Sequence, residues 1–153
     1  MEGHYYHVKG DQMKLTAKTY YALVASVDLT KNYGKGPLRA ASIAEKHNIP
    51  TRFLELILNE LKSAGVIDSK RGAEGGFYLT DSPETITVYD LVRAIEGEIT
   101  IVDCAKVSGQ GECMFQEYMG GLQSTIINYF KNTTLKQLAD SAKEELGVLN
   151  YVI

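Results

Sequence analysis

Two cysteines are the residues of this sequence with the most versatile chemistry. The chain has 153 residues, and its cysteines are Cys104 and Cys113. They lie in and just after a stretch, 98–112, that contains glycines and acidic residues and is expected to form an exposed loop. Thiolates bind soft metal ions, and a pair of thiols can oxidise to a disulfide. The polar start MEGHYYHVKGDQ has no apolar signal-peptide core, so we expect reduced thiols, metal ligands or redox sensors before a structural crosslink.

A second group of residues is suited to binding an anion. It is a basic, glycine-rich turn between two segments that are predicted to be short strands, 66–69 and 77–80. The turn contains Lys70, Arg71, Gly72, Gly75 and Gly76. A flexible cationic hairpin tip of this kind can follow the DNA backbone or enter the minor groove.

The segment before the hairpin predicts the helix that must position it. Its aliphatic residues recur at a spacing that places them on one helical face, namely Leu54, Ile57, Leu58 and Leu61. We expect Thr51 to cap the start of this helix and Gly65 to end it in the left-handed conformation. A helix followed by a hairpin with a cationic tip predicts a winged helix-turn-helix, with the helix in the major groove of DNA.

The rest of the chain is predicted to be helical. A first helix over 13–33 is expected to begin after a Thr16 cap and to bury an apolar face that includes Tyr20. Another helix is expected over 38–47. After the hairpin, a helix over 87–95 opens with a capping box. A last helix, from 134 to about 146, opens with a second such box.

A long helix is predicted over 113–131, and its apolar residues are spaced 4, 3, 4, 3. These residues are Phe115, Met119, Leu122, Ile126 and Tyr129. This spacing is typical of two helices that pack along their length. Packing on the chain's own domain is the alternative, but little of the chain remains to cover so long a stripe. A partner helix is therefore favoured.

Composition limits the classes of protein to consider. The chain is 44% hydrophobic and 23% charged, as expected of a globular protein, and no apolar run is long enough to span a membrane. We therefore expect a cytoplasmic protein. The net charge of −3 alone argues against a nucleic-acid partner. However, residues 13–95 carry eleven Lys and Arg against nine Asp and Glu, so the part of the chain with the predicted winged helix is net positive. No phosphate-binding glycine loop or nucleophile motif indicates an enzyme.

Several of these segments together resemble one bacterial family. MKLTAKTYYAL, IAEKHNIPTRFLELILNELKSAGVIDSKRGAEGGFYL, ITVYDLVRAIEG and TTLKQLAD resemble, in this order, the Rrf-two family of winged-helix transcription regulators, which includes IscR, NsrR and CymR. The resemblance covers residues 13–140. It implies a mainly helical fold with a small β-hairpin, and a cytoplasmic homodimer that binds a palindromic DNA operator through long crossing helices.

The resemblance also implies which residues contact DNA. The helix that contains Leu54 becomes the recognition helix, and the Arg71 turn becomes the wing. At the start of the recognition helix, Arg52 can bond a guanine or a phosphate, and Glu55 can accept from a cytosine amino group. Arg71 can enter a narrow minor groove. The implied contacts are Lys14, Thr16, Lys18, Thr51, Arg52, Phe53, Glu55, Lys70, Arg71, Gly72, Gly75 and Gly76; the alternative for each is a solvated surface residue.

The cysteines depart from the pattern of the family's iron–sulfur branch. Those relatives hold a [2Fe–2S] cluster with three cysteines and a fourth, different ligand. Cys104 and Cys113 match the first and last cysteine, and the middle one is absent. His47 aligns with a histidine that a few members use as a ligand, but the matching carboxylate position is Tyr20. Gln116 stands where some members place a further ligand shortly after the last cysteine. Two thiolates hold one iron at best.

Three interpretations of the cysteine loop stay open. Cys104 and Cys113 hold a cluster or another metal, they form a thiol switch, or they have no redox role. In the last case a small ligand or a protein partner controls the regulator, and the winged helix acts as an interaction module. The predicted organisation is a flexible extension over 1–12, a DNA-binding domain over 13–96, and the cysteine loop with dimerisation helices over 97–153.

Overall fold

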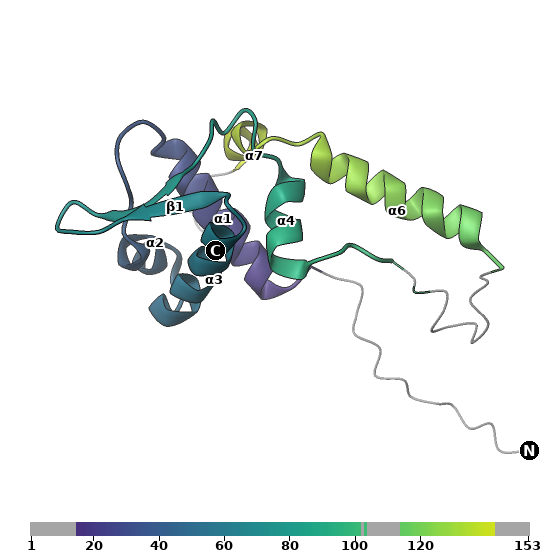
Figure 1. Ribbon diagram of the computed structural model, residues 1–153, viewed down its shortest axis with the longest axis horizontal. Coiled ribbons are helices and arrows are strands. Elements are labelled where there is room, and N and C mark those ends of the chain that lie inside the picture. The colour runs from purple at the N-terminus through teal and green to yellow at the C-terminus, as the bar shows by residue number, and fades with distance from the viewer. Residues whose placement is uncertain (1–14, 102, 104–113, 143–153) are drawn as a thin grey trace, which may run out of the picture.

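The computed structural model describes residues 15–101, 103 and 114–142, and shows a helical body from which one long helix extends (Figure 1). The mainly helical fold with a small β-hairpin, as predicted, is confirmed. None of the described helices is long and apolar enough to cross a membrane. The elements in chain order are α1 (Ala17–Lys31), α2 (Ala40–His47), α3 (Thr51–Ser63), β1 (Ile67–Lys70), β2 (Gly76–Leu79), α4 (Val88–Glu96), α6 (Gln116–Lys131) and α7 (Leu135–Ser141).

Helix α3 lies in the helical body with its predicted aliphatic face inward. It contacts α1, α2 and α4. The side chains at the centre of this contact are inaccessible to solvent: Leu54, Ile57, Leu58 and Leu61. The predicted stripe is therefore confirmed, and burying it leaves the opposite face of α3 in solvent.

The two ends of α3 differ in how well the sequence predicted them. The prediction that Thr51 caps the helix is wrong. Pro50 occupies the cap position with no side-chain cap bond, and Thr51 is the first helical residue. Proline has a fixed φ that suits the entry to a helix, so the helix begins without a side-chain cap. Gly65 has a φ of +79°, as predicted for the residue that follows this helix.

The hairpin is a two-stranded antiparallel sheet whose strands are each displaced by one residue from the predicted ones. Its register pairs Ile67 with Leu79 and Lys70 with Gly76. Leu38 joins β2 as a short third partner, because its N–H donates to Phe77 O at 2.9 Å and its carbonyl accepts from Phe77 N at 2.7 Å. This pairing explains why α2 begins at Ala40, two residues after the predicted start.

Helix α1 lies at the centre of the body and contacts α3, α4 and α7. The Thr16 cap is confirmed, since its Oγ1 accepts from Thr19 N at 3.2 Å. The prediction that Tyr20 belongs to the buried face is wrong, because its side chain is 57% exposed. The buried face instead carries mostly small side chains, which allow the neighbouring helices to approach: Thr19, Ala22, Ala25, Ser26 and Leu29.

Helices α4 and α7 begin at the capping boxes that the sequence predicts. Thr87 with Asp90, and Thr134 with Gln137, each exchange both of the required hydrogen bonds. The two helix starts are joined, because Leu135 N donates to Ile86 O at 2.8 Å. The last helix thus returns to the helical body, where Leu135 is fully buried. Its predicted extent beyond residue 142 lies outside the described residues.

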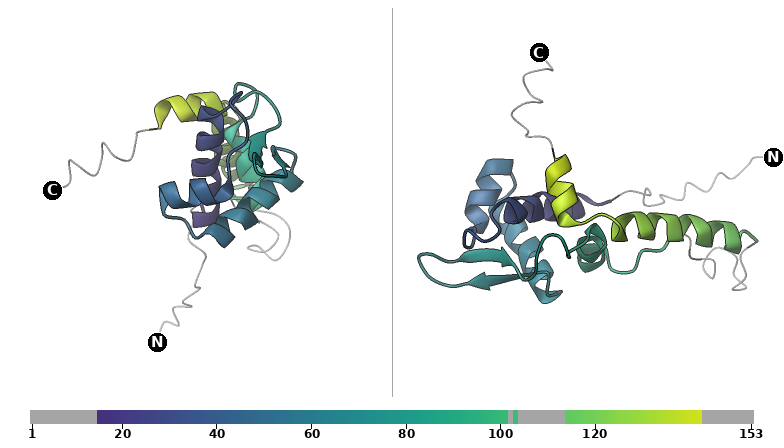
Figure 2. Two further views of the ribbon diagram at one scale, coloured as in Figure 1. Left: turned by 90° about the vertical axis from the view of Figure 1, so that its left-hand side faces the viewer. Right: turned by 90° about the horizontal axis from the view of Figure 1, so that it is seen from above.

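Helix α6 extends away from the body, and none of its described side chains is buried (Figures 1 and 2). The helix is continuous through Gly120 and Gly121. Of the predicted apolar stripe, Phe115 is 60% exposed and Tyr129 is 75% exposed. Phe115, Leu122 and Tyr129 are therefore presented to solvent, whereas Met119 and Ile126 are half-buried on a helix that contacts α4.

The carboxylate of Glu96 ties the end of α4 to the start of α1. Its Oε1 accepts from Thr16 N at 3.2 Å, from Thr16 Oγ1 at 2.6 Å and from Thr19 Oγ1 at 2.5 Å. Partial burial acts to raise the pKa of Glu96. The hydrogen bonds from both threonines and the nearby Lys18 ammonium outweigh it, so that the pKa of this carboxyl is lowered.

This clamp predicts a pH-dependent contribution to stability. Because the Glu96 pKa is lower in the folded state, the stabilisation is present above the unfolded pKa of about 4.3 and is lost as the pH falls through the folded value. We expect Glu96→Gln to be less stable than the parent protein at neutral pH, and the difference in unfolding free energy to shrink as the pH falls below about 4.3. Urea denaturation across this range measures it, and Glu84→Gln, on an exposed carboxylate, controls for the lost charge. A difference independent of pH would contradict the clamp.

Candidate nucleic-acid interface

The outward face of α3 presents several different chemical groups to solvent. Arg52, Glu55, Leu56 and Asn59 are all exposed. Positions three and four apart lie next to each other on a helix, so these side chains form one surface. A guanidinium, a carboxylate, an amide and an aliphatic group are thus available along one line of the helix.

Phe53 lies at the edge of this surface and takes a structural position. Its ring is half-buried and packs edge-on against Tyr21 of α1, with the ring centroids 5.8 Å apart at an interplanar angle of 85°. Edge-to-face packing of this kind stabilises two aromatic rings beyond their burial. The structure therefore places Phe53 as an anchor of α3 on α1, whereas Arg52 beside it is free of the core.

The turn between β1 and β2 exposes its basic residues. Lys70, Arg71 and Gly72 are exposed. The two later glycines shape the turn: a Cβ on Gly75 would lie 2.3 Å from Lys70 O, and one on Gly76 would lie 2.3 Å from Leu38 O. The five predicted wing residues therefore divide into three that face solvent and two that let the backbone close.

Arg39 is a residue that the sequence analysis missed. It caps α2, and its guanidinium Nη2 donates a hydrogen bond to the carbonyl of Ala73 in the turn. With the Leu38–Phe77 pairing, this contact joins the wing to the start of α2. Nothing in the local sequence indicates that Arg39 reaches a residue 34 positions later.

The start of α1, where the resemblance implies DNA contacts of Lys14, Thr16 and Lys18, makes contacts within the protein. The backbone N–H and the side-chain hydroxyl of Thr16 both donate to Glu96 Oε1. Lys18 pairs with Glu60 of α3 at 2.5 Å. Lys14 lies outside the described residues. The α1 groups that would attract a phosphate thus have carboxylate partners within the chain.

His47, a candidate metal ligand in the sequence, contacts a carboxylate between α1 and α2. Its Nε2 lies 2.8 Å from Asp28 Oδ2, and Lys46 Nζ lies 2.9 Å from Asp28 Oδ1. Asp28 is buried, so these two contacts from α2 hold its carboxylate and fasten α2 to α1.

Among the described residues, no three or more His, Cys, Asp or Glu side chains gather as a metal site would require. Cys104 and Cys113 lie outside these residues. A [2Fe–2S] cluster needs four ligands, of which two cysteines supply half. Two further ligands would have to come from other residues.

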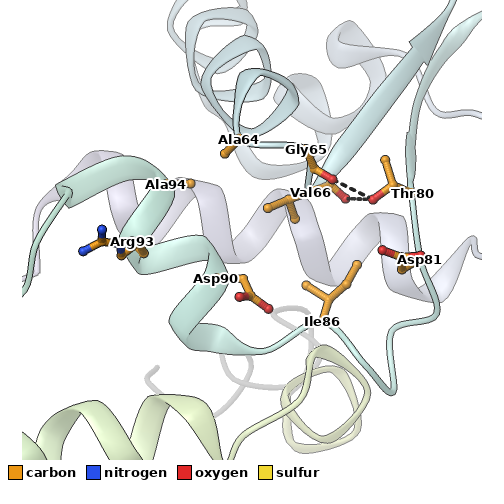
Figure 3. Close-up of a pocket in the computed structure, with 9 residues that line it drawn as sticks. All are labelled: Ala64, Gly65, Val66, Thr80, Asp81, Ile86, Asp90, Arg93 and Ala94. Carbon is orange, nitrogen blue, oxygen red and sulfur yellow. Dashed lines mark hydrogen bonds between the residues drawn. The ribbon is translucent and has the colours of Figure 1, made fainter.

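A cavity of about 560 Å³ lies between the end of α3, the base of the hairpin and α4 (Figure 3). It is lined by Ala64, Gly65, Val66, Thr80, Asp81, Ile86, Asp90, Arg93 and Ala94. Two of its polar groups hold neighbouring backbone in place: Thr80 Oγ1 donates to the carbonyls of Gly65 and Val66, and Asp90 forms the capping box of α4. The lining residues do not include a nucleophile next to a general base, which would indicate catalysis.

Comparison with known proteins agrees with a DNA-binding architecture. The profile of the Rrf2 family, described as iron-dependent transcriptional regulator, matches residues 15–141. The HTH-type transcriptional regulator CymR of Bacillus subtilis is 34% identical over 141 residues, which cover 92% of this chain and 100% of CymR. The HTH-type transcriptional regulator IscR of Vibrio vulnificus is 32% identical over 132 residues, or 82% of this chain and 77% of IscR.

A solved structure shares the fold along most of the chain. The structure of CymR (YrzC), the global cysteine regulator of B. subtilis, superposes with a TM-score of 0.76 at 32% identity, covering 86% of this chain and 99% of that one. These relatives are transcriptional regulators, so the prediction that this chain is not an enzyme is confirmed. The resemblance found in the sequence is confirmed as well, and the chain belongs to the Rrf2 family of DNA-binding transcription regulators.

Proposed function

We propose that this protein is a cytoplasmic, homodimeric transcription regulator that binds a palindromic operator and responds to the state of Cys104 and Cys113. The observation that carries the proposal is the separation of two surfaces. The wing and the outer end of α3 lie at one end of the molecule, and α6 extends towards the other (Figures 1 and 2). DNA binding and dimerisation therefore use opposite ends of the molecule.

The DNA-binding end combines two means of recognition. Arg52 and Glu55 on α3 offer a donor and an acceptor to base edges in the major groove. Arg71, on the exposed wing, adds a cation for the minor groove or a phosphate. Since Arg39 and Leu38 hold the wing against the start of α2, the wing and α3 reach DNA in a fixed relation.

The apolar stripe of α6 supports the proposed dimer. A second copy of the same helix offers Met119, Leu122 and Ile126 a matching surface at the same spacing. A dimer with two-fold symmetry presents two identical copies of α3, and such a pair fits an operator with two inverted half-sites.

The signal enters between α4 and α6. The segment with both cysteines joins Glu96, which is fastened to α1, to the start of α6. Two alternative chemistries are proposed for the cysteines. In the first, their thiolates bind iron or an iron–sulfur cluster; in the second, they form a disulfide. In the second, each thiol loses a proton and an electron to an oxidant such as a peroxide as the S–S bond forms. Either change can shift the balance between dimer geometries with different operator affinity.

A second candidate function omits the cysteine chemistry. It is favoured by the cysteine count, because Cys104 and Cys113 supply two of the four ligands that a [2Fe–2S] cluster needs. In this case a small ligand or a protein partner controls the regulator, and the winged helix also serves as an interaction module.

The dimer interface is tested with Leu122→Asp. Placing a charge in the centre of the apolar stripe is expected to shift the dimer dissociation constant by tenfold or more, because an unpaired charge would be buried. Analytical ultracentrifugation measures the change. Ser124→Asp, which adds the same charge to an exposed position on the same helix, should leave the dimer intact. A dimer that tolerates both substitutions would place the interface elsewhere.

The wing is tested with Arg71→Ala. A lost guanidinium contact is expected to weaken operator binding by about tenfold to a hundredfold and to reduce the salt dependence of binding by about one ion. Titration of labelled operator at several salt concentrations measures both quantities. Lys136→Ala removes a cation of α7 that is paired with Asp140, and it should bind as the parent protein does. Equal affinities for Arg71→Ala and the parent would remove the wing from the proposal.

The two cysteine states and the second candidate give different results with protein purified without oxygen. A visible absorption spectrum with bound iron and sulfide is expected for a cluster. A colourless, iron-free protein whose operator affinity changes with an oxidant, and stops changing in Cys104→Ser, is expected for a thiol switch. If neither the spectrum nor the affinity responds, the cysteine mechanism is excluded and the second candidate stands.

A further inference from the structure

We propose that Leu56 reads the methyl group of a thymine in each half-site of the operator. The proposal rests on the proposed function, in which α3 lies in the major groove. It assigns a direct role in sequence recognition to an apolar residue that the analysis of charged and polar side chains overlooked.

Leu56 is unlike the other aliphatic residues of its helix. Its side chain is 51% exposed, whereas Leu54, Ile57, Leu58 and Leu61 are inaccessible. A single exposed leucine is common on protein surfaces. The position of this one is informative, because it lies on the surface that α3 turns away from the helical body.

The neighbours of Leu56 place it within the line of side chains that meets DNA. Arg52 is four residues before it and Asn59 is three residues after it, so both adjoin it on the outward face. Both are exposed. A helix that inserts this face into the major groove therefore brings Leu56 to the base edges together with Arg52.

Thymine is the base whose major-groove edge an aliphatic side chain can recognise. Its C5 methyl group is the apolar feature of that edge, where the other bases present hydrogen-bond donors and acceptors. Leu56 has no donor or acceptor to offer, and a contact with this methyl removes apolar surface of both partners from water. Arg52 and Asn59 match guanine and adenine respectively, so the face distinguishes three bases by three kinds of contact.

The test removes the methyl group alone. An operator is first selected by the full-length protein from a random duplex library. Each symmetric pair of thymines is then replaced by deoxyuridine, which differs only in lacking the C5 methyl. At one of these pairs we expect the affinity of the parent protein to fall by about fourfold per half-site, which corresponds to the loss of one buried methyl group.

The variant Leu56→Ala makes the test specific. It should bind the thymine operator more weakly than the parent does, and it should bind the thymine and deoxyuridine operators equally at that pair. Leu15→Ala, which shortens another exposed leucine, should keep the full deoxyuridine effect. Thermal unfolding of each variant shows that it is folded.

Either of two outcomes would overturn the inference alone. If no deoxyuridine pair changes the affinity of the parent protein, or if Leu56→Ala keeps the effect, Leu56 does not read a methyl group. Arg71→Ala would still weaken binding in that case, and the proposed function would stand. If the parent protein selects no duplex at all, the proposed function fails, and this inference fails with it.

Discussion

The burial of one face of α3 is the constraint on which the other features of the molecule depend. Leu54, Ile57, Leu58 and Leu61 are all inaccessible to solvent, and each contributes roughly 1.5–3 kcal/mol by being removed from water. Rotating the helix would expose this stripe, so its orientation is fixed by the core. The composition of the opposite face is therefore free to serve recognition, since no packing requirement acts on it.

The contacts around α3 turn separate elements into one rigid surface. Phe53 fastens it to α1, Asp28 fastens α2 to α1, and Leu38 with Arg39 fastens the hairpin to the start of α2. These contacts involve backbone carbonyls, a buried carboxylate and aromatic rings, none of which needs DNA to form. A surface organised in advance loses less conformational entropy when it binds.

Elements that depend on local sequence were predictable, and contacts between distant residues were not. The stripe of α3, the Thr16 cap and both capping boxes involve residues within one or two helical turns, so their spacing identifies them. The Thr51 cap was wrong because Pro50 already supplies the entry geometry. Tyr20 was misplaced because α1 needs small side chains at a crowded centre, and the bond from Arg39 to Ala73 leaves no local signal. Leu56 could have been found from the same periodicity, as the aliphatic residue of α3 that does not belong to the buried stripe.

The pairing of Thr87 with Thr134 has a consequence for how this protein can change over evolution. These two residues stand directly before α4 and α7, so the chain between them, which includes α4 on the helical body and α6 extending from it, forms a loop whose ends are paired. The free-energy cost of closing such a loop rises slowly, by about 0.6 kcal/mol for each doubling of its length. Insertions and deletions between α4 and α6 are therefore inexpensive for the fold. The segment that contains Cys104 and Cys113 can be shortened or extended while the helical body keeps its structure.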